Sequence, residues 1–179
     1  MTFISLLRGI NVSGQKKILM SDLKTLYESL GFEKVQTYIQ SGNVIFSSKE
    51  IDTKEIALKI EEKISAHYNF HVPVLVLTEN EINAVLNNNP FLKENIANTD
   101  RFYVSFLSEE PHPDYTNKIN SALYMPDRFI ISEKCIFLHI SENGYGNTKL
   151  SNNFFESKLK VKATTRNWKT IIALSRLVS

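Results

Sequence analysis

The sequence has little cysteine, glycine and proline, and it has no long apolar run. One cysteine in 179 residues excludes an internal disulfide framework. No stretch approaches the roughly 20 consecutive apolar residues that a membrane-spanning helix needs. Six glycines and five prolines against 42% hydrophobic residues exclude a fibrous or disordered chain and leave a globular protein with a buried core.

We expect no secretory leader, because residues 1–8 are too short for a signal peptide and carry no basic stretch at their start. Together with the single cysteine, this favours a cytoplasmic protein without a membrane partner. Net charge is only +2, but residues 147–179 contain seven Lys or Arg against one acid, Glu156. Such a basic end suits a phosphate-bearing partner, and it suits a solvated lysine-rich helix equally well.

The most informative stretch is Arg8–Lys17, which reads RGINVSGQKK. It lies between a strand-like run at residues 3–7 and a helix-like run at residues 22–30. Glycines let backbone N–H groups turn toward a ligand, and cations attract an anion, so the composition suits an anion site. The same composition also describes an ordinary turn beside a basic surface. The residues concerned are Arg8, Gly9, Asn11, Gly14, Lys16 and Lys17.

Gly9 and Gly14 are spaced as in a phosphate-binding P-loop, but the match is incomplete. That motif requires Lys directly after the second glycine and then Ser or Thr. Here Gln15 intervenes before Lys16, and the helix begins too late for its N-terminus to complete a phosphate cradle. A looser anion or nucleotide site and a purely structural loop are the two interpretations left.

Hydrophobic periodicity predicts one order of elements twice, strand-helix-strand-strand-helix-strand. In the first half the strands are 3–7, 35–39, 44–47 and 72–77, with helices at 22–30, capped by Ser21, and from Thr53 to Ile64, capped by Thr53. Pro73 places the strand 72–77 at a sheet edge. In the second half the strands are 102–107, 129–132, 135–140 and 161–163, and the helices are 115–123 and 149–159. Further helices are expected at 79–87 and 165–177.

This order is that of a ferredoxin-like unit. We therefore predict an α+β fold of two tandem ferredoxin-like halves, residues 1–78 and 101–179. A connecting helix and linker occupy residues 79–100, and an added helix ends the chain. Strands that are apolar on both faces, such as residues 44–46, indicate that both sheet faces are covered.

The predicted topology makes the loop 8–17 and the hairpin Gln40–Asn43 neighbours, because right-handed crossovers place both at one end of the sheet. Ser41 and Asn43 thereby join the candidate site. The equivalent loops of the second half, residues 108–110 and 132–134, are acidic and lack glycine. We expect the site in the first half alone.

A third polar segment, Thr164–Trp168, opens the last predicted helix, with Thr164 or Thr165 as its N-cap. Helical spacing places Trp168 on the packed face. Arg166 and Asn167 complete the list of candidate binding residues, Arg166 pointing at solvent or at a bound phosphate.

Three blocks, LRGINV at residues 7–12, TYIQSGNV at residues 37–44 and TTRNW at residues 164–168, together resemble the bacterial family called domain of unknown function 1697. The similarity runs over essentially the whole chain. The resemblance implies a duplicated ferredoxin-like fold and no established activity. Ser13 departs from the family pattern, where a glycine is expected in a Val-Gly-Gly loop.

No enzyme motif stands out. Cys135 and His139 share a strand face but lie four residues apart, roughly 13 Å, too far for a nucleophile and its base. His67 and His71 lack the further Cys or carboxylate ligands of a metal site. The aromatic pattern by which RNA-recognition domains stack bases on their sheet is missing. We predict neither a metal nor a cofactor.

Our leading hypothesis is a cytoplasmic protein that binds a phosphate-bearing ligand, nucleotide or nucleic acid, at the loop 8–17. Arg8, Lys16 and Lys17 supply charge, and Gly9 and Gly14 supply backbone donors. Neutral hydrogen bonds come from Asn11, Ser41 and Asn43. One alternative is an enzyme acting on a small polar metabolite at the same loops, with catalytic residues unknown. The other is a protein-interaction module without a ligand.

Overall fold

The computed structural model describes residues 1–94, 96 and 98–178. The chain forms two compact units, residues 1–83 with 174–179 and residues 84–173. Each unit contains a four-stranded antiparallel sheet with helices, which confirms the α+β class. Residues 95 and 97 of the predicted linker, and residue 179, lie outside the described residues.

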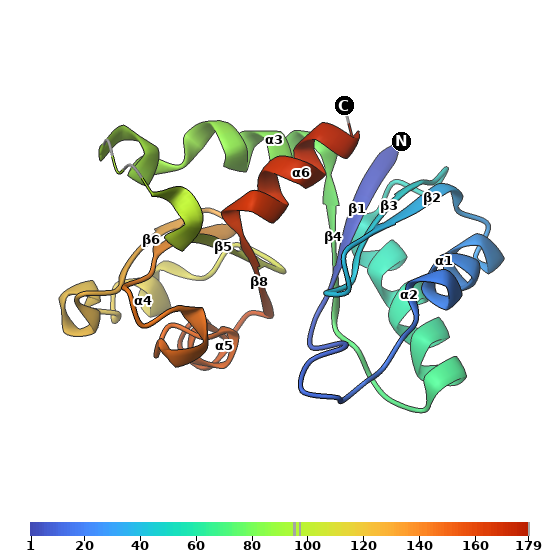
Figure 1. The fold of residues 1–179 in the computed structure, drawn as a ribbon, viewed down its shortest axis with the longest axis horizontal. Coiled ribbons are helices and arrows are strands. Elements are labelled where there is room, and N and C mark those ends of the chain that lie inside the picture. Colours follow the sequence, from blue (N-terminus) through green and yellow to red (C-terminus); the bar gives the residue numbers. More distant parts are fainter. Residues whose placement is uncertain (95, 97, 179) are drawn as a thin grey trace. The chain divides into compact units, whose positions relative to one another are not determined.

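The sheet of the first unit has the strand order β2-β3-β1-β4. Its strands are β1 (Thr2–Leu7), β2 (Glu33–Tyr38), β3 (Asn43–Ser47) and β4 (Val74–Thr78). Helices α1 (Met20–Ser29) and α2 (Thr53–Tyr68) cover one face of this sheet (Figure 1). Strand β4 lies at an edge, as Pro73 predicted.

Both faces of this sheet are buried. Toward the helices, Phe3, Leu7 and Phe46 form a core with apolar residues of α1 and α2. The hydroxyl groups of Ser5 and Tyr27 lie 2.7 Å apart within it, and burial raises the pKa of Tyr27. On the opposite face Ile4 and Leu6 are fully buried. Buried apolar side chains therefore occur on both faces of this sheet, as the sequence predicted.

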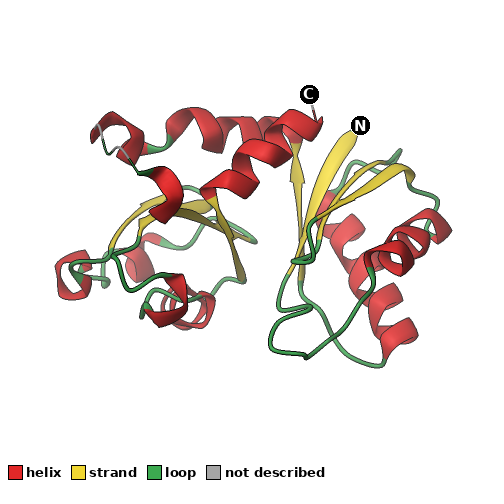
Figure 2. Ribbon diagram, in the orientation of Figure 1, coloured by secondary structure: helices red, strands yellow, loops and turns green. Residues whose placement is uncertain are grey.

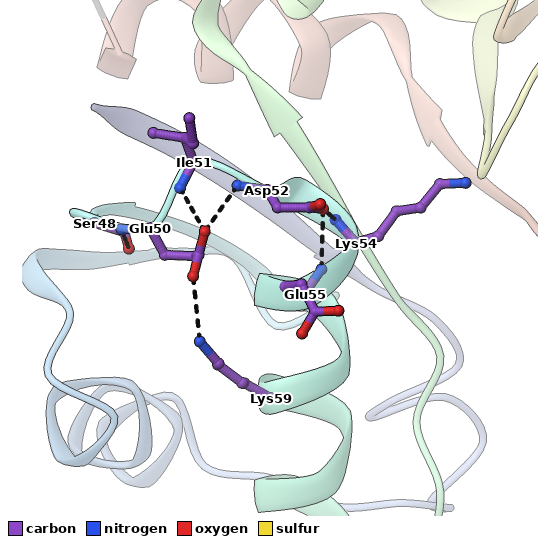
Figure 3. A network of polar contacts seen from close by, with 7 residues as sticks. All are labelled: Ser48, Glu50, Ile51, Asp52, Lys54, Glu55 and Lys59. Atoms are coloured by element: carbon purple, nitrogen blue, oxygen red, sulfur yellow. Dashed lines mark hydrogen bonds and ion pairs between the residues drawn. The ribbon is translucent and has the colours of Figure 1, made fainter.

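The N-terminus of α2 shows how local chemistry fixes a helix start (Figure 3). The Asp52 carboxylate accepts hydrogen bonds from the N–H groups of Lys54 (2.8 Å) and Glu55 (3.2 Å), so Asp52 is the N-cap and the prediction of Thr53 was wrong. Glu50 accepts from the N–H groups of Asp52 and Ile51, and these bonds lower the pKa of its carboxyl.

The predicted cap of α1 was also wrong. The helix begins one residue before Ser21, after Leu19, and no side chain caps it. The Ser21 hydroxyl donates to the Asp22 carboxylate instead (3.2 Å).

The second unit repeats the topology of the first, in the order β6-β7-β5-β8. Its strands are β5 (Phe102–Leu107), β6 (Arg128–Ser132), β7 (Cys135–His139) and β8 (Ala163–Asn167). Its helices are α4 (Pro113–Thr116) and α5 (Asn152–Leu159), with 3₁₀ helices η1 (Pro90–Glu94), η2 (Thr99–Arg101), η3 (Ser121–Tyr124) and η4 (Tyr145–Asn147).

Helices α3 (Glu79–Asn88) and α6 (Trp168–Val178) each contain a boundary between the units. Helix α6 is the added C-terminal helix that the sequence predicted. Within the described part of the chain, no helix combines the length and the apolar character that crossing a membrane requires.

Three elements predicted for the second half of the chain have other bounds in the structure. The expected helix 115–123 is split into α4 and η3, because the Asn120 side chain accepts a hydrogen bond from the Ala122 N–H (3.1 Å) and starts a new turn. The strand expected at residues 161–163 is observed as β8, at Ala163–Asn167. The helix predicted from residue 165 therefore begins later, at Trp168. The Asn167 side chain accepts from the Thr170 N–H (2.8 Å), so neither Thr164 nor Thr165 is the N-cap.

Corresponding strand ends are held by the same backbone bonds in both units. The Leu7 N–H donates to the carbonyl of the hairpin residue Gly42 (2.8 Å). In the second unit the Leu107 N–H donates to the carbonyl of the hairpin residue Lys134 (2.8 Å). The next N–H groups, of Arg8 and Ser108, donate to the residue before the last strand, Pro73 (2.9 Å) and Lys162 (3.0 Å). The first and last strands of each unit therefore end in matching geometry.

Candidate functional site

Between β1 and α1 the loop of residues 8–19 contains a small hairpin (drawn green in Figure 2). The Gln15 N–H donates to the Val12 carbonyl (2.9 Å), and the Asn11 N–H donates to the Lys16 carbonyl (3.2 Å). Ser13 and Gly14, the central residues, both have positive φ angles of 50° and 74°. That combination is the signature of a type I′ turn. Gly14 is therefore needed for the positive φ angle of this turn, and Ser13 occupies a position that also favours glycine.

Asn11 joins three segments through its side-chain amide. Its Nδ2 group donates to the carbonyls of Ile18 and Gln40, both at 2.9 Å, and its Oδ1 atom accepts from the Ile18 N–H, also at 2.9 Å. The bond to Gln40 confirms that the loop and the Gln40–Asn43 hairpin are neighbours. Because both N–H donors of the amide are used, Asn11 shapes the loop.

In the hairpin, Gly42 and Asn43 stabilise the local structure. Gly42 has φ +76°, and a Cβ atom there would lie 2.7 Å from Leu7 Cβ and 2.7 Å from Ile10 Cδ1. Asn43 is fully buried, and its Nδ2 group donates to the Tyr38 carbonyl (3.0 Å) and the Ser41 hydroxyl (3.1 Å). The hairpin thus packs directly against Leu7 and Ile10, the residues at the root of the loop.

The cations of the loop differ in their surroundings. Arg8 is half-buried and Lys17 is exposed. Lys16 is half-buried, and its ammonium group donates to the His71 carbonyl (2.7 Å), which ties the loop to the segment before β4. No acidic residue occurs in residues 8–19 or 37–43. These two segments together contain three basic residues and no acidic one.

The last two candidates, Arg166 and Asn167, belong to the second unit. Arg166 is 8% exposed, and its guanidinium donates to the Thr164 hydroxyl (3.2 Å) and the Thr165 carbonyl (2.9 Å). Burial lowers the pKa of Arg166 to about 10. Asn167 is exposed and caps α6. Trp168 is buried, which confirms its packing role.

The structure also brings together a charged cluster that the sequence did not reveal. Both guanidinium Nη atoms of Arg128 bond the Glu94 carboxylate at 2.7 Å, and the guanidinium lies 5.0 Å from the ring centroid of Phe91. The His139 ring packs edge-on against Phe102. These residues come from η1, β5, β6 and β7, and no spacing in the chain signals their meeting.

His139 makes the stability of this cluster depend on pH. The pKa of His139 lies below its ordinary value, first because the ring is partly buried and then because of the positive charge of Arg128. The charge of Arg101 also lowers this pKa, whereas the charges of Glu94 and Asp127 raise it. The unfolded chain therefore binds the proton more readily. The contribution of His139 to stability is full above its ordinary pKa and is lost as the pH falls below it.

The wild type should lose unfolding free energy as the pH falls from about 7.5 to about 5.5, and we expect this loss to be smaller in His139→Phe. Urea denaturation at the two pH values measures it. The phenyl ring keeps the aromatic packing and cannot take up a proton. The wild-type protein, unfolded in urea at the same two pH values, is the reference. An unaltered pH dependence in His139→Phe would contradict the assignment.

The single cysteine lies in the interior of the second unit. Cys135 is buried, its thiol donates to the Ser132 carbonyl (3.3 Å), and burial raises its pKa to about 12. Such a thiol is a poor nucleophile at neutral pH. Among the residues that the structure describes, no three His, Cys, Asp or Glu side chains are placed to hold a metal ion.

Comparison with known proteins finds a family model that matches and a solved structure with a similar fold. Residues 1–137 match the family model described as protein of unknown function, DUF1697. The block at residues 164–168 lies outside that range. A solved structure, that of the conserved bacterial protein SP0830 from Streptococcus pneumoniae, is similar with a TM-score of 0.74 and 24% identity, covering 99% of this chain and 98% of that one. No curated protein matches the chain.

Proposed function

The chain belongs to the DUF1697 family, and we propose that it binds a phosphate-bearing ligand, a nucleotide or a nucleic acid, through the loop of residues 8–17. The observation that carries the proposal is the exposed tip of the loop. Within the described residues, the N–H groups of Ser13 and Gly14 donate to no protein acceptor. Lys17 is exposed three residues further on, and no acid lies in the loop. Backbone donors beside a cation suit a phosphate.

The proposal divides the candidate residues into two groups. Asn11 and Asn43 hold the loop and the hairpin in shape, since their side chains bond within the unit, and Gly42, which is not a candidate, allows the hairpin to pack. Arg8, Lys16 and Lys17 provide the charge, with Gly9, Gly14 and Ser41 beside them. A rigid loop loses little conformational freedom on binding, which favours affinity. Arg166 and Asn167 lie in the second unit, where Arg166 is 8% exposed and Asn167 caps α6, so the loop site of the first unit is proposed without them.

Replacing Lys17 with alanine tests the proposal. We expect weaker binding of labelled single-stranded RNA or DNA in fluorescence anisotropy, and a slope of log affinity against log salt that is smaller by about 1, because one phosphate contact is lost. Lys63→Ala, an exposed lysine on α2, is the matched control and should keep the wild-type slope.

The same titration separates the two ligand classes. A free nucleoside triphosphate that competes with the oligonucleotide identifies a nucleotide site, and binding of the polymer alone identifies a nucleic-acid site. The proposal is wrong if neither ligand binds the wild-type protein, or if Lys17→Ala and Lys63→Ala have the same salt dependence as the wild type.

We also propose that the two units are copies of one ferredoxin-like fold. The equal strand orders and the matching bonds of Leu7 with Leu107 and Arg8 with Ser108 support a duplication. So do two glutamates, Glu61 and Glu156, which accept the first N–H of β4 and of β8 at 2.8 and 2.9 Å. The division into residues 1–78, 79–100 and 101–179 belongs to this proposal, as does a cytoplasmic location, where the Cys135 thiol stays reduced.

A further inference from the structure

In the two sheets that the described residues form, three of the four edge strands carry a feature that hinders pairing with another strand. In β4, the outward N–H groups of Val74 and Thr78 donate to the carboxylates of Glu61 and Glu81, both at 2.8 Å. In β8, the Ala163 N–H donates to the Glu156 carboxylate (2.9 Å). Strand β2 contains a register irregularity between residues 33 and 36, where Lys34 has a φ angle of 52°. Such bulges and strained positions turn an edge away from a partner.

Strand β6 carries none of these features. Its sequence RFIIS has no proline, lysine or acid, its pairing with β7 is regular, and Ile130 is 39% exposed. A two-residue loop joins Ser132 to Cys135, so that pair closes the hairpin with hydrogen bonds. By alternation, the outward backbone groups of β6 belong to Phe129 and Ile131. No residue in the described chain hydrogen-bonds them.

We propose that β6 is a dimerisation edge, at which two copies of this chain pair their β6 strands antiparallel about a two-fold axis through Ile130. In this register Phe129 of one copy faces Ile131 of the other, and each pair exchanges two backbone hydrogen bonds. The two Ile130 side chains meet at the axis in a close, non-hydrogen-bonded position. An edge with matching ends is what a two-fold contact requires.

Charge favours a second copy as the occupant. The one charged residue of the strand, Arg128, faces the neutral Ser132 of the other copy, so like charges do not oppose each other. Arg128 is also already neutralised by Glu94 within its own chain. A short strand with four intermolecular bonds gives a weak dimer, whose population rises with protein concentration.

Sedimentation equilibrium of the full chain tests the pairing. The wild-type mass should rise toward twice the 20.5 kDa monomer as concentration increases to about 1 mM. Ile130→Lys should stay monomeric, because two ammonium groups would meet at the axis. Leu58→Lys, at a 50% exposed aliphatic residue on α2, should behave as the wild type. A monomeric wild type, or a dimer that persists in Ile130→Lys, would overturn the proposal.

A cross-link tests the register itself. Cα atoms of a non-hydrogen-bonded antiparallel pair lie about 4.5 Å apart, within reach of a disulfide. Ile130→Cys should therefore form a covalent dimer under mild oxidation, visible on a non-reducing gel, much faster than Leu58→Cys. The native Cys135 is buried, so the unmodified protein should not cross-link. Equal cross-linking of the two cysteine variants would show that Ile130 does not lie on the axis.

Discussion

Gly42→Ala is expected to lower the free energy of unfolding by about 3 kcal/mol, from a left-handed backbone penalty of about 1–2 kcal/mol and overpacking of about 1–3 kcal/mol. The new methyl group would lie 2.7 Å from Leu7 Cβ, and another 2.7 Å contact would form with Ile10 Cδ1. Leu7 and Ile10 are both buried and cannot move aside without disturbing the core. Urea denaturation followed by circular dichroism measures the loss.

Gly31→Ala separates the two contributions to that loss. Gly31 has φ +80°, close to the +76° of Gly42, but no atom lies within 4 Å of its added Cβ. We therefore expect only the backbone penalty, about 1 kcal/mol, in this control. The difference between the two variants reports the contact of the hairpin with the root of the loop. Equal losses would mean that Gly42 is needed for its φ angle alone.

Asn11→Asp is expected to have the second largest effect, a loss of about 3 kcal/mol, because an ionised carboxylate would face two carbonyl oxygens that the amide now bonds. Those are the oxygens of Ile18 and Gln40, each 2.9 Å from Nδ2. Chemical denaturation at neutral pH measures this change. The proposed binding of a phosphate-bearing ligand should also fail in this variant, although Asn11 need not touch that ligand.

Asn11→Gly is the control for that variant. Glycine adopts the φ of 54° found at position 11 without strain, so it removes the hydrogen bonds of the side chain and adds no repulsion. We expect it to lose about 2 kcal/mol, less than Asn11→Asp. If both variants unfolded at the wild-type urea concentration, the amide would have no role in holding the loop.

Most of the fold could be predicted from the sequence, because the spacing of apolar residues and the turn residues between them indicate each helix and strand within a short stretch of chain. Strand β5 was predicted with its observed bounds, and the neighbourhood of the loop 8–17 and the Gln40–Asn43 hairpin follows from topology alone. The errors fell where side chains compete for backbone groups. Asp52 rather than Thr53 caps α2, and Asn167 rather than a threonine caps α6. Neighbouring polar residues offer several caps, and packing decides among them.

The candidate site was only partly predictable. Composition marks Arg8–Lys17 as a basic loop with glycines, but it does not show that Asn11 and Asn43 spend their donors inside the unit. Nor does it show that Lys16 bonds the carbonyl of His71, 55 positions away. The cluster of Arg128, Glu94 and His139 has no local sequence signature, because tertiary structure alone brings its members together.

The matching bonds of Arg8 and Ser108 have a consequence for how such proteins diversify. Each bond pins the chain where it leaves the sheet, so the connection beyond can lengthen without disturbing the strands. One connection spans residues 8–19 and the other residues 108–112, and closing the longer one costs only about 0.8 kcal/mol more. The sheet end thus acts as an anchored insertion point, at which a connection can gain residues while the strands keep their pairing.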